Sequence, residues 1–193
     1  MVLTMEYKKK KTFKTEDENG NKKDPMPEIF NLLSKRDYSI KAFEQKLIQK
    51  GLFEEDAKRI CVSLSEKGYL NDERYAARVT EIYYEKYGIR RVENELLKRG
   101  LEIELVKKIT DEFYDRQKAV EHIYIEARKV LNSASTQKRL NTPGYERSKE
   151  YQRLFGKFFR TGYNSSEIKE ALSMCEEFKE EKYNEEDDNL NDE

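Results

Sequence analysis

The chain has 193 residues, of which 40% are charged and 36% hydrophobic, and its formal net charge is −1. No apolar run approaches the roughly 20 residues that cross a bilayer, and only two cysteines are present, which excludes a membrane-spanning bundle and a disulfide scaffold. Both Cys61 and Cys175 fall on apolar helical faces, so we expect reduced core residues and a cytoplasmic protein without a membrane partner.

The two ends of the chain carry opposite charge. Residues 1–23 hold seven lysines and four acidic residues, whereas residues 179–193 hold eight acidic residues and two lysines. Runs of like charge repel one another and bury no apolar surface, so we expect 1–27 to be a disordered basic arm and 179–193 a disordered acidic tail. Contact of the basic arm with phosphates is the less favoured interpretation.

Apolar residues recur with helical spacing from Glu28 onward. In chain order the stripes include Ile40–Phe43–Leu47, Ala57–Ile60–Leu64, Ala76–Val79–Tyr83, Ile89–Val92–Leu96, Leu105–Ile109–Phe113, Ala119–Ile123–Ala127, Leu154–Phe155–Phe158 and Ile168–Leu172–Cys175. No segment alternates polar and apolar residues over a useful length, so we predict an all-α fold. The Ser/Thr/Asn-rich stretch near 132–146, which contains Pro-Gly, is predicted to be a loop.

An internal repeat organises these helices. A shift of 49 residues lays 38-YSIKAFEQKLIQKGLFEEDAKRI-60 on 87-YGIRRVENELLKRGLEIELVKKI-109, and a weaker third copy lays 155–172 on 30–47. Repeats of two or three short helices cannot bury both faces alone, so we predict that they stack into an elongated, curved array that suits a polymeric partner. The predicted repeats are 28–70, 71–115 and 116–178, the last with the loop near 132–146.

A recurrent helix stop separates these elements. Leucine is followed four residues later by glycine and then a hydrophobic residue, and the glycine supplies the left-handed backbone that ends a helix. In the joint 64-LSEKGYLNDERYAARV-79 we expect Tyr69 to fold back on Leu64, Asn71 to cap the next helix, and Leu70 to pack as a staple on Tyr75. The structural junction residues are Gly51, Gly68, Tyr69, Leu70, Asn71, Asp72, Tyr75 and Gly100.

The residue types that carry enzymatic chemistry are sparse. His122 is the single histidine, and although it is four residues from Glu126, no second histidine or cysteine lies near, so a structural role is favoured over a metal site. The chain has no phosphate-binding loop, no dinucleotide fingerprint and no nucleophile elbow. We therefore expect no enzymatic activity, no metal and no cofactor.

Basic residues are the more informative candidates. They are Arg74, Arg78, Arg90, Arg91, Lys98 and Arg99 in the second repeat and Arg153, Lys157 and Arg160 in the third. Arg90 and Arg91 lie in the first turn of their predicted helix, where cations oppose the helix dipole. This placement indicates an anionic partner, either DNA or an acidic protein surface. The alternative is a solvated face whose cations pair with the many glutamates.

The run 68-GYLNDERYA-76, followed by 87-YGIRRVENELLKRGL-101 and 158-FFRTGY-163, resembles the RecX family, bacterial regulators of the RecA recombinase. The resemblance covers about 28–178 and implies three tandem three-helix repeats. It also implies a non-enzymatic protein that binds the RecA–DNA filament and limits its growth, ATP turnover and strand exchange in DNA repair, homologous recombination and the SOS response. We expect the protein to be a monomer. Its partners would be RecA and DNA, either directly or through the filament.

Two other functions fit short helices joined by glycine turns. One is a helix-turn-helix nucleic-acid-binding protein, and the other is a helical scaffold for protein–protein interaction. A helix-turn-helix protein should show one strongly basic recognition helix. Here the charge is spread over several helices, which disfavours that alternative.

Overall fold

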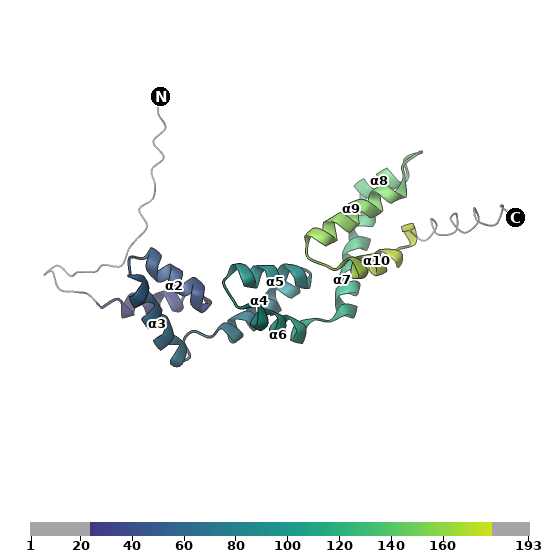
Figure 1. The fold of residues 1–193 in the computed structure, drawn as a ribbon. Coiled ribbons are helices and arrows are strands. Elements are labelled where there is room, and N and C mark those ends of the chain that lie inside the picture. The colour runs from purple at the N-terminus through teal and green to yellow at the C-terminus, as the bar shows by residue number, and fades with distance from the viewer. Residues whose placement is uncertain (1–23, 179–193) are drawn as a thin grey trace, which may run out of the picture. The chain divides into compact units, whose positions relative to one another are not determined.

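The computed structural model describes residues 24–178, so the expected tail at 179–193 and residues 1–23 of the expected arm lie outside the described residues (Figure 1). The expected arm was drawn to residue 27, which is too long, because the first helix already begins at Met26. Every regular element within 24–178 is helical, which confirms the all-α prediction. The elements are α1 (Met26–Leu33), α2 (Ile40–Gln49), α3 (Glu54–Glu66), α4 (Asp72–Tyr84), α5 (Ile89–Lys98), α6 (Ile103–Phe113), α7 (Arg116–Leu131), α8 (Ala134–Leu140), α9 (Arg147–Arg160), α10 (Ser165–Ser173) and the short 3₁₀ helix η1 (Glu176–Phe178).

The described residues divide into two compact units. Unit 1 comprises 24–78 and 96–106, and unit 2 comprises 79–95 and 107–178. Helices α4, α5 and α6 each contribute residues to both units, so the division falls within the second predicted repeat. None of the helices in 24–178 is long and apolar enough to cross a membrane.

Unit 1 has its core between α1, α2 and α3. One face of each helix supplies it, and the fully or nearly fully buried residues are Ile29, Tyr38, Phe43, Leu47, Ala57, Cys61, Leu64 and Leu70. The Cys61 thiol is free, and burial together with the nearby Glu44 carboxylate raises its pKa to about 11. Cys61 is therefore a protonated core residue at neutral pH.

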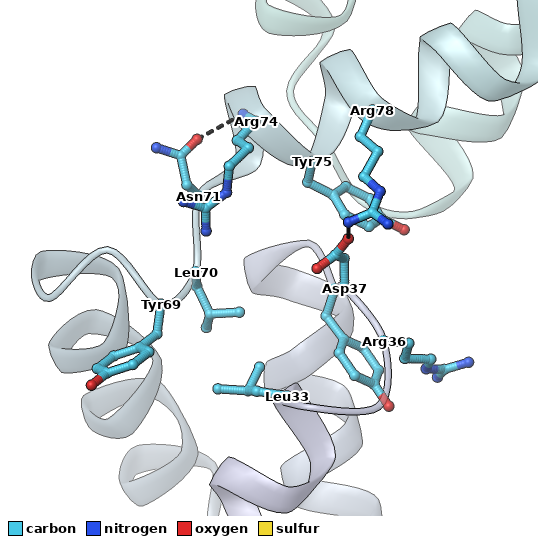
Figure 2. Close-up of a pocket in the computed structure, with 10 residues that line it drawn as sticks. Leu33, Arg36, Asp37, Tyr69, Leu70, Asn71, Arg74, Tyr75 and Arg78 are labelled. Carbon is cyan, nitrogen blue, oxygen red and sulfur yellow. Dashed lines mark hydrogen bonds and ion pairs between the residues drawn. The ribbon is translucent and has the colours of Figure 1, made fainter.

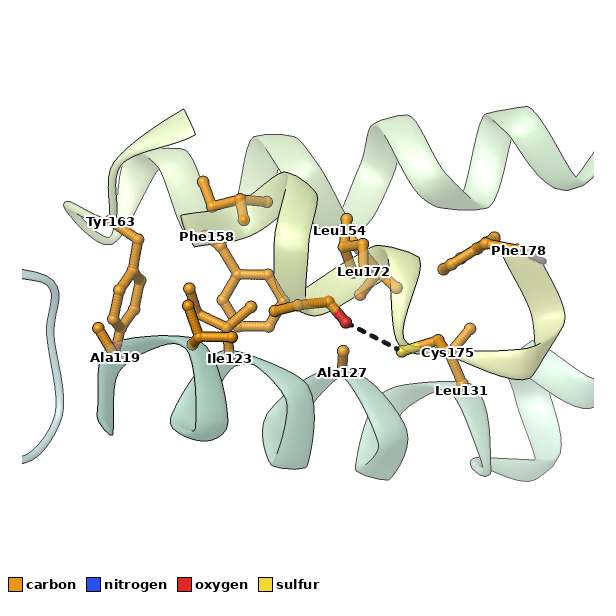
Figure 3. Close-up of a cluster of buried hydrophobic side chains, with 13 residues drawn as sticks. Ala119, Ile123, Ala127, Leu131, Leu154, Phe158, Tyr163, Leu172, Cys175 and Phe178 are labelled. Atoms are coloured by element: carbon orange, nitrogen blue, oxygen red, sulfur yellow. Dashed lines mark hydrogen bonds between the residues drawn. The ribbon is translucent and has the colours of Figure 1, made fainter. Parts of the chain in front are cut away.

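Unit 2 has its core between α7, α9 and α10 (Figure 3). Positions spaced three or four apart on α7, among them Ile123, Ala127 and Leu131, face Leu154 and Phe158 of α9. Residues of α10 and η1 complete the cluster, and the thiol of Cys175, which is not in a disulfide, donates to the Ala171 carbonyl at 3.7 Å. Helical periodicity on each element thus produces one continuous apolar layer.

Four helices end on a glycine with positive φ. These are Gly51 (φ 100°), Gly68 (75°), Gly100 (82°) and Gly162 (97°). In each case the residue after the glycine donates its N–H to the carbonyl five positions earlier, at N···O distances of 2.8–3.4 Å. This is the Schellman arrangement, which satisfies helix-end carbonyls that would otherwise lack a partner. The stop at Gly162 was not among the three read from the sequence.

The fourth stop corrects the register of the third repeat. The sequence comparison laid 155–172 on 30–47, which pairs α9 with α1. In the structure, α9 ends at Gly162 just as α2 ends at Gly51 and α5 at Gly100, and the next helix begins three residues after each glycine. Helix α9 is therefore the equivalent of α2 and α5. The additional helix α8 lies between α7 and α9 in the chain. It lengthens the third repeat, so the spacing between corresponding helices differs from the one assumed in the sequence comparison.

The stretch 132–146 was predicted to be a loop, and that prediction is wrong for 134–140, which form α8. The Ser133 side chain accepts a hydrogen bond from the Thr136 N–H and so caps the helix. The amide of Gln137 then donates to the Leu131 carbonyl at the end of α7, at 2.8 Å. Serine, threonine and asparagine favour both loops and helix N-termini, and here capping prevails.

Helix-end carbonyls bind the N-termini of other helices in both units. In unit 1, the Ser39 hydroxyl at the start of α2 donates to the Arg99 carbonyl at the end of α5, at 2.5 Å. In unit 2, the Gly88 N–H before α5 donates to the Thr161 carbonyl at the end of α9, at 3.0 Å. The 49-residue shift makes Ser39 and Gly88 equivalent, so the same junction is built twice.

Glycine is required at Gly88 for space, not for φ, because a Cβ there would lie 2.3 Å from backbone atoms of Gly162 and Tyr163. A Cβ at Gly68 would meet nothing within 4 Å, although φ is +75°. Gly68→Ala is therefore expected to cost about 1 kcal/mol through left-handed strain alone, and Gly88→Ala about 2–3 kcal/mol through overpacking of the junction. Urea unfolding of both variants measures the difference, and a milder effect of Gly88→Ala would contradict it.

Candidate interaction surface

The joint after α3 is a network inside unit 1 (Figure 2). Asn71 caps α4 by accepting a hydrogen bond from the Arg74 N–H at 2.7 Å, as the sequence predicts. The Asp72 carboxylate instead accepts the Ile40 N–H at the start of α2, at 2.8 Å. Burial raises the pKa of Asp72, with a contribution from Glu102, and the Ile40 hydrogen bond partly offsets that rise. The joint thus ties α4 to α2.

The aromatic residue of the joint packs differently from the expectation that it folds back on Leu64. The Tyr69 ring lies edge-on to Phe30 of α1, with ring centroids 5.1 Å apart, and the side chain is half exposed. Leu70 is the joint residue that enters the core with Leu64. The chain reversal at Gly68 therefore directs Leu70 inward and leaves Tyr69 at the surface.

Three arginines surround a hollow of about 170 Å³ beside this joint (Figure 2). The Arg78 guanidinium pairs with Asp37 at 2.6 Å, and Arg74 donates to the Gly68 carbonyl at 3.1 Å. Arg36, which the sequence analysis missed, lies over the Tyr38 ring at 4.3 Å. The one sequence feature that could have indicated Arg36 is its position in the short connection between α1 and α2. Each of these cations has a partner inside unit 1.

Arg90 and Arg91 have a local structural reason that the sequence did not show. The Arg90 N–H donates to the Gly162 carbonyl at 3.2 Å, and its guanidinium lies 5.2 Å from the Phe159 ring centroid. The Arg91 guanidinium lies 4.0 Å from the centroid of Tyr87. The carbonyl end of α9 faces these residues, and its negative dipole offsets the unfavourable placement of cations at a helix N-terminus. Contacts within unit 2 thus account for Arg90 and Arg91 in the first turn of α5, so their placement does not by itself indicate an anionic partner.

The remaining second-repeat candidates lie at the end of α5. Arg99 donates to the Tyr75 hydroxyl at 2.8 Å, and its carbonyl is the group bound by Ser39. Lys98 is exposed. A cation at the C-terminal end of a helix interacts favourably with the helix dipole. Arg99 also supplies the carbonyl of the unit 1 junction, so its position has a structural reason.

Of the third-repeat candidates, Arg153 binds a buried carboxylate, together with Arg139 of α8. Glu150 on α9 is fully buried and accepts hydrogen bonds from Arg153 and Arg139, and from the Tyr145 hydroxyl at 3.1 Å. Burial by itself raises the pKa of Glu150, but these three donors outweigh it and hold the pKa below its ordinary value. Because Arg139 lies on α8, the ion pair fixes α8 against α9. One carboxylate with two guanidinium groups leaves a net positive charge at the surface.

The other two candidates follow along α9. Lys157 lies over the Phe158 ring at 5.1 Å. The exposed Arg160 folds back so that a Cβ at Gly156 would lie 3.2 Å from its Nη1. Unit 2 thus brings together Arg90, Arg153, Lys157 and Arg160 on or beside α9, whereas Arg74, Arg78 and Arg99 belong to unit 1.

His122 is a structural residue in this arrangement. Its Nδ1 is 2.8 Å from the Tyr163 hydroxyl, and Tyr163 is buried directly after the Gly162 stop. Between residues 24 and 178 there is no group of three His, Cys, Asp or Glu residues placed to hold a metal ion.

Comparison with known proteins gives the family. The chain is 32% identical over 146 residues to "Regulatory protein RecX" of Caldanaerobacter subterraneus subsp. tengcongensis, and the alignment covers 75% of this chain and 67% of the relative. The chain belongs to the RecX family. It is also 35% identical over 83 residues to "Regulatory protein RecX" of Trichlorobacter lovleyi, covering 42% of this chain and 54% of that protein.

The fold agrees with this relationship. The crystal structure of RecX from Lactobacillus salivarius matches with a TM-score of 0.65 at 18% identity, and it covers 77% of this chain and 92% of that chain. At this identity the match speaks for the fold alone. No family model matches the chain.

Glu150→Gln is expected to destabilise the chain by about 2 kcal/mol, less than a fully buried ion pair would cost because both arginines are half exposed. The pKa of Glu150 is lower in the folded state, so its stabilisation is fully present above the ordinary value of 4.5 and is lost as pH falls below it. Urea unfolding at pH 7 and at pH 3.5 measures this. An equal difference between variant and unsubstituted chain at both pH values would contradict the assignment.

Proposed function

We propose that this protein regulates RecA by binding the RecA–DNA filament, with inhibition of recombinase and ATPase activity as the expected outcome. Membership of the RecX family is the observation that carries the proposal. The relatives are named as regulatory proteins. A regulator acts through binding, and we infer that this chain is non-enzymatic and needs neither a cofactor nor a metal.

The described surface supports binding to an anionic assembly. The hollow in unit 1 is lined by Arg36, Arg74 and Arg78, and α9 in unit 2 presents Arg153 and Arg160. A DNA-bearing filament is polyanionic, so cations on both units provide complementary charge. We propose a monomer that acts in the cytoplasm, where RecA assembles on DNA.

The test is RecA-dependent ATP hydrolysis stimulated by single-stranded DNA. Purified RecA is assembled on DNA, the full chain is added over a range of ratios, and the steady-state hydrolysis rate is followed. We expect the rate to fall as the protein is added. A protein of similar size and net charge serves as the control for non-specific effects.

The same measurement separates the alternatives. An unchanged rate, at ratios where the protein co-sediments with the filament, would contradict regulation of RecA and leave a helical scaffold. An unchanged rate with binding to naked DNA but not to the filament would favour the helix-turn-helix alternative.

A further inference from the structure

Positive charge is concentrated on the hairpin formed by α8 and α9. Between 134 and 160 the chain has seven lysines or arginines and two glutamates. One of the two glutamates, Glu150, is fully buried beneath Arg139 and Arg153. The rest of 24–178 carries 22 lysines or arginines and 25 acidic residues, so the positive charge is local to this hairpin.

Gly156 lies in the interior of α9, where glycine weakens a helix relative to alanine. It has no positive φ, and a Cβ added there would meet only the flexible guanidinium of Arg160, at 3.2 Å and beyond. Neither backbone conformation nor packing within the described chain therefore requires glycine. Glycine leaves this part of the helix without a side chain, so a ligand can approach the helix backbone more closely there than at any other residue type.

An exposed aromatic side chain lies beside this glycine. Phe159 is 44% exposed and stacks on Phe155 with ring centroids 6.2 Å apart and an interplanar angle of 12°. The Arg90 guanidinium lies 5.2 Å from the Phe159 centroid. Aromatic rings and guanidinium planes both provide stacking surfaces for unpaired bases. All of these groups belong to unit 2.

We propose that the outer face of α9, defined by Arg153, Gly156, Phe159 and Arg160 and extended by Arg90, binds single-stranded nucleic acid. The strand's phosphates lie against the helix backbone at Gly156, where a side chain would hold them away. Arg153 and Arg160 neutralise the phosphates on either side. A base stacks on the exposed part of Phe159 or on Arg90. This inference rests on the proposed function only for the relevance of DNA.

A single strand fits these features better than an acidic protein segment does. Carboxylates would satisfy the arginines, but they require neither an exposed aromatic ring nor a bare helix backbone. A sugar–phosphate backbone running across α9 uses both, since successive nucleotides present phosphate and base together. Charge and shape therefore favour the same ligand class.

The two consequences of Gly156→Ala have opposite signs. Alanine raises helix propensity, so the melting temperature should rise by about 1–4 °C. The added methyl group would crowd the strand where it lies against the helix, so affinity for a labelled oligo(dT) should fall about tenfold, the effect of overpacking one close contact. Binding is measured by fluorescence anisotropy on the full chain, without RecA, from 50 mM salt upward.

A matched control and a charge variant complete the experiment. Asn31→Ala also favours a helix and leaves the charge unchanged, but it lies on α1 in unit 1, so its affinity should equal that of the unsubstituted chain. Arg160→Ala should reduce the slope of log affinity against log salt by about 0.7, whereas Gly156→Ala should leave the slope unchanged.

Three outcomes would overturn the inference. The first is no measurable oligo(dT) binding by the unsubstituted chain at 50 mM salt. The second is oligo(dT) binding that neither Gly156→Ala nor Arg160→Ala alters. The third is loss of RecA ATPase suppression in Gly156→Ala with unchanged oligo(dT) binding, which would assign this face to RecA itself. The last two leave the proposed regulation of RecA standing.

Discussion

A helix that ends on a left-handed glycine turns its last carbonyl groups outward, and in this chain those carbonyls bind the first N–H or capping group of another helix. Arg99 and Thr161 supply the carbonyls, and Ser39 and Gly88 supply the donors. Unsatisfied groups at two helix ends are thereby paired with each other, and dipole ends of opposite sign meet. The stops at Gly100 and Gly162 are thus both the terminator of one helix and the site at which another helix docks.

The docking of helix starts on helix-end carbonyls uses some of the arginines and so limits which arginines are available to bind a partner. Arg91 and Arg99 flank the docked helix ends, and their guanidinium groups contact the Tyr87 ring and the Tyr75 hydroxyl of their own units. Removing them would alter the junctions as well as the surface. The α8–α9 hairpin is different, because its buried Glu150 fixes two arginines from beneath and leaves a net positive face outward.

The sequence predicts helices and their ends well because both depend on local chemistry. Apolar spacing places the core residues, and the leucine–glycine pattern locates the stops at Gly51, Gly68 and Gly100. The junctions could not be predicted, since a main-chain carbonyl such as that of Thr161 has no side-chain signature. Glu150 resembles a surface glutamate until Arg139 of the unexpected helix α8 covers it. The local contacts of Arg90 could not be foreseen either, because the Gly162 carbonyl that accepts its N–H lies 72 residues further along the chain.

The two equivalent junctions differ in the substitutions that each can tolerate. The contact of Ser39 with the Arg99 carbonyl uses a hydroxyl, so threonine could replace serine, and any residue can supply the carbonyl. Gly88 and Gly162 instead meet through main-chain atoms. Enlarging either one cannot be compensated by trimming the other, because both are already the smallest residue. Among related sequences, the residues of the first junction can be substituted one at a time. Gly88 and Gly162 of the second junction must be retained together or lost together.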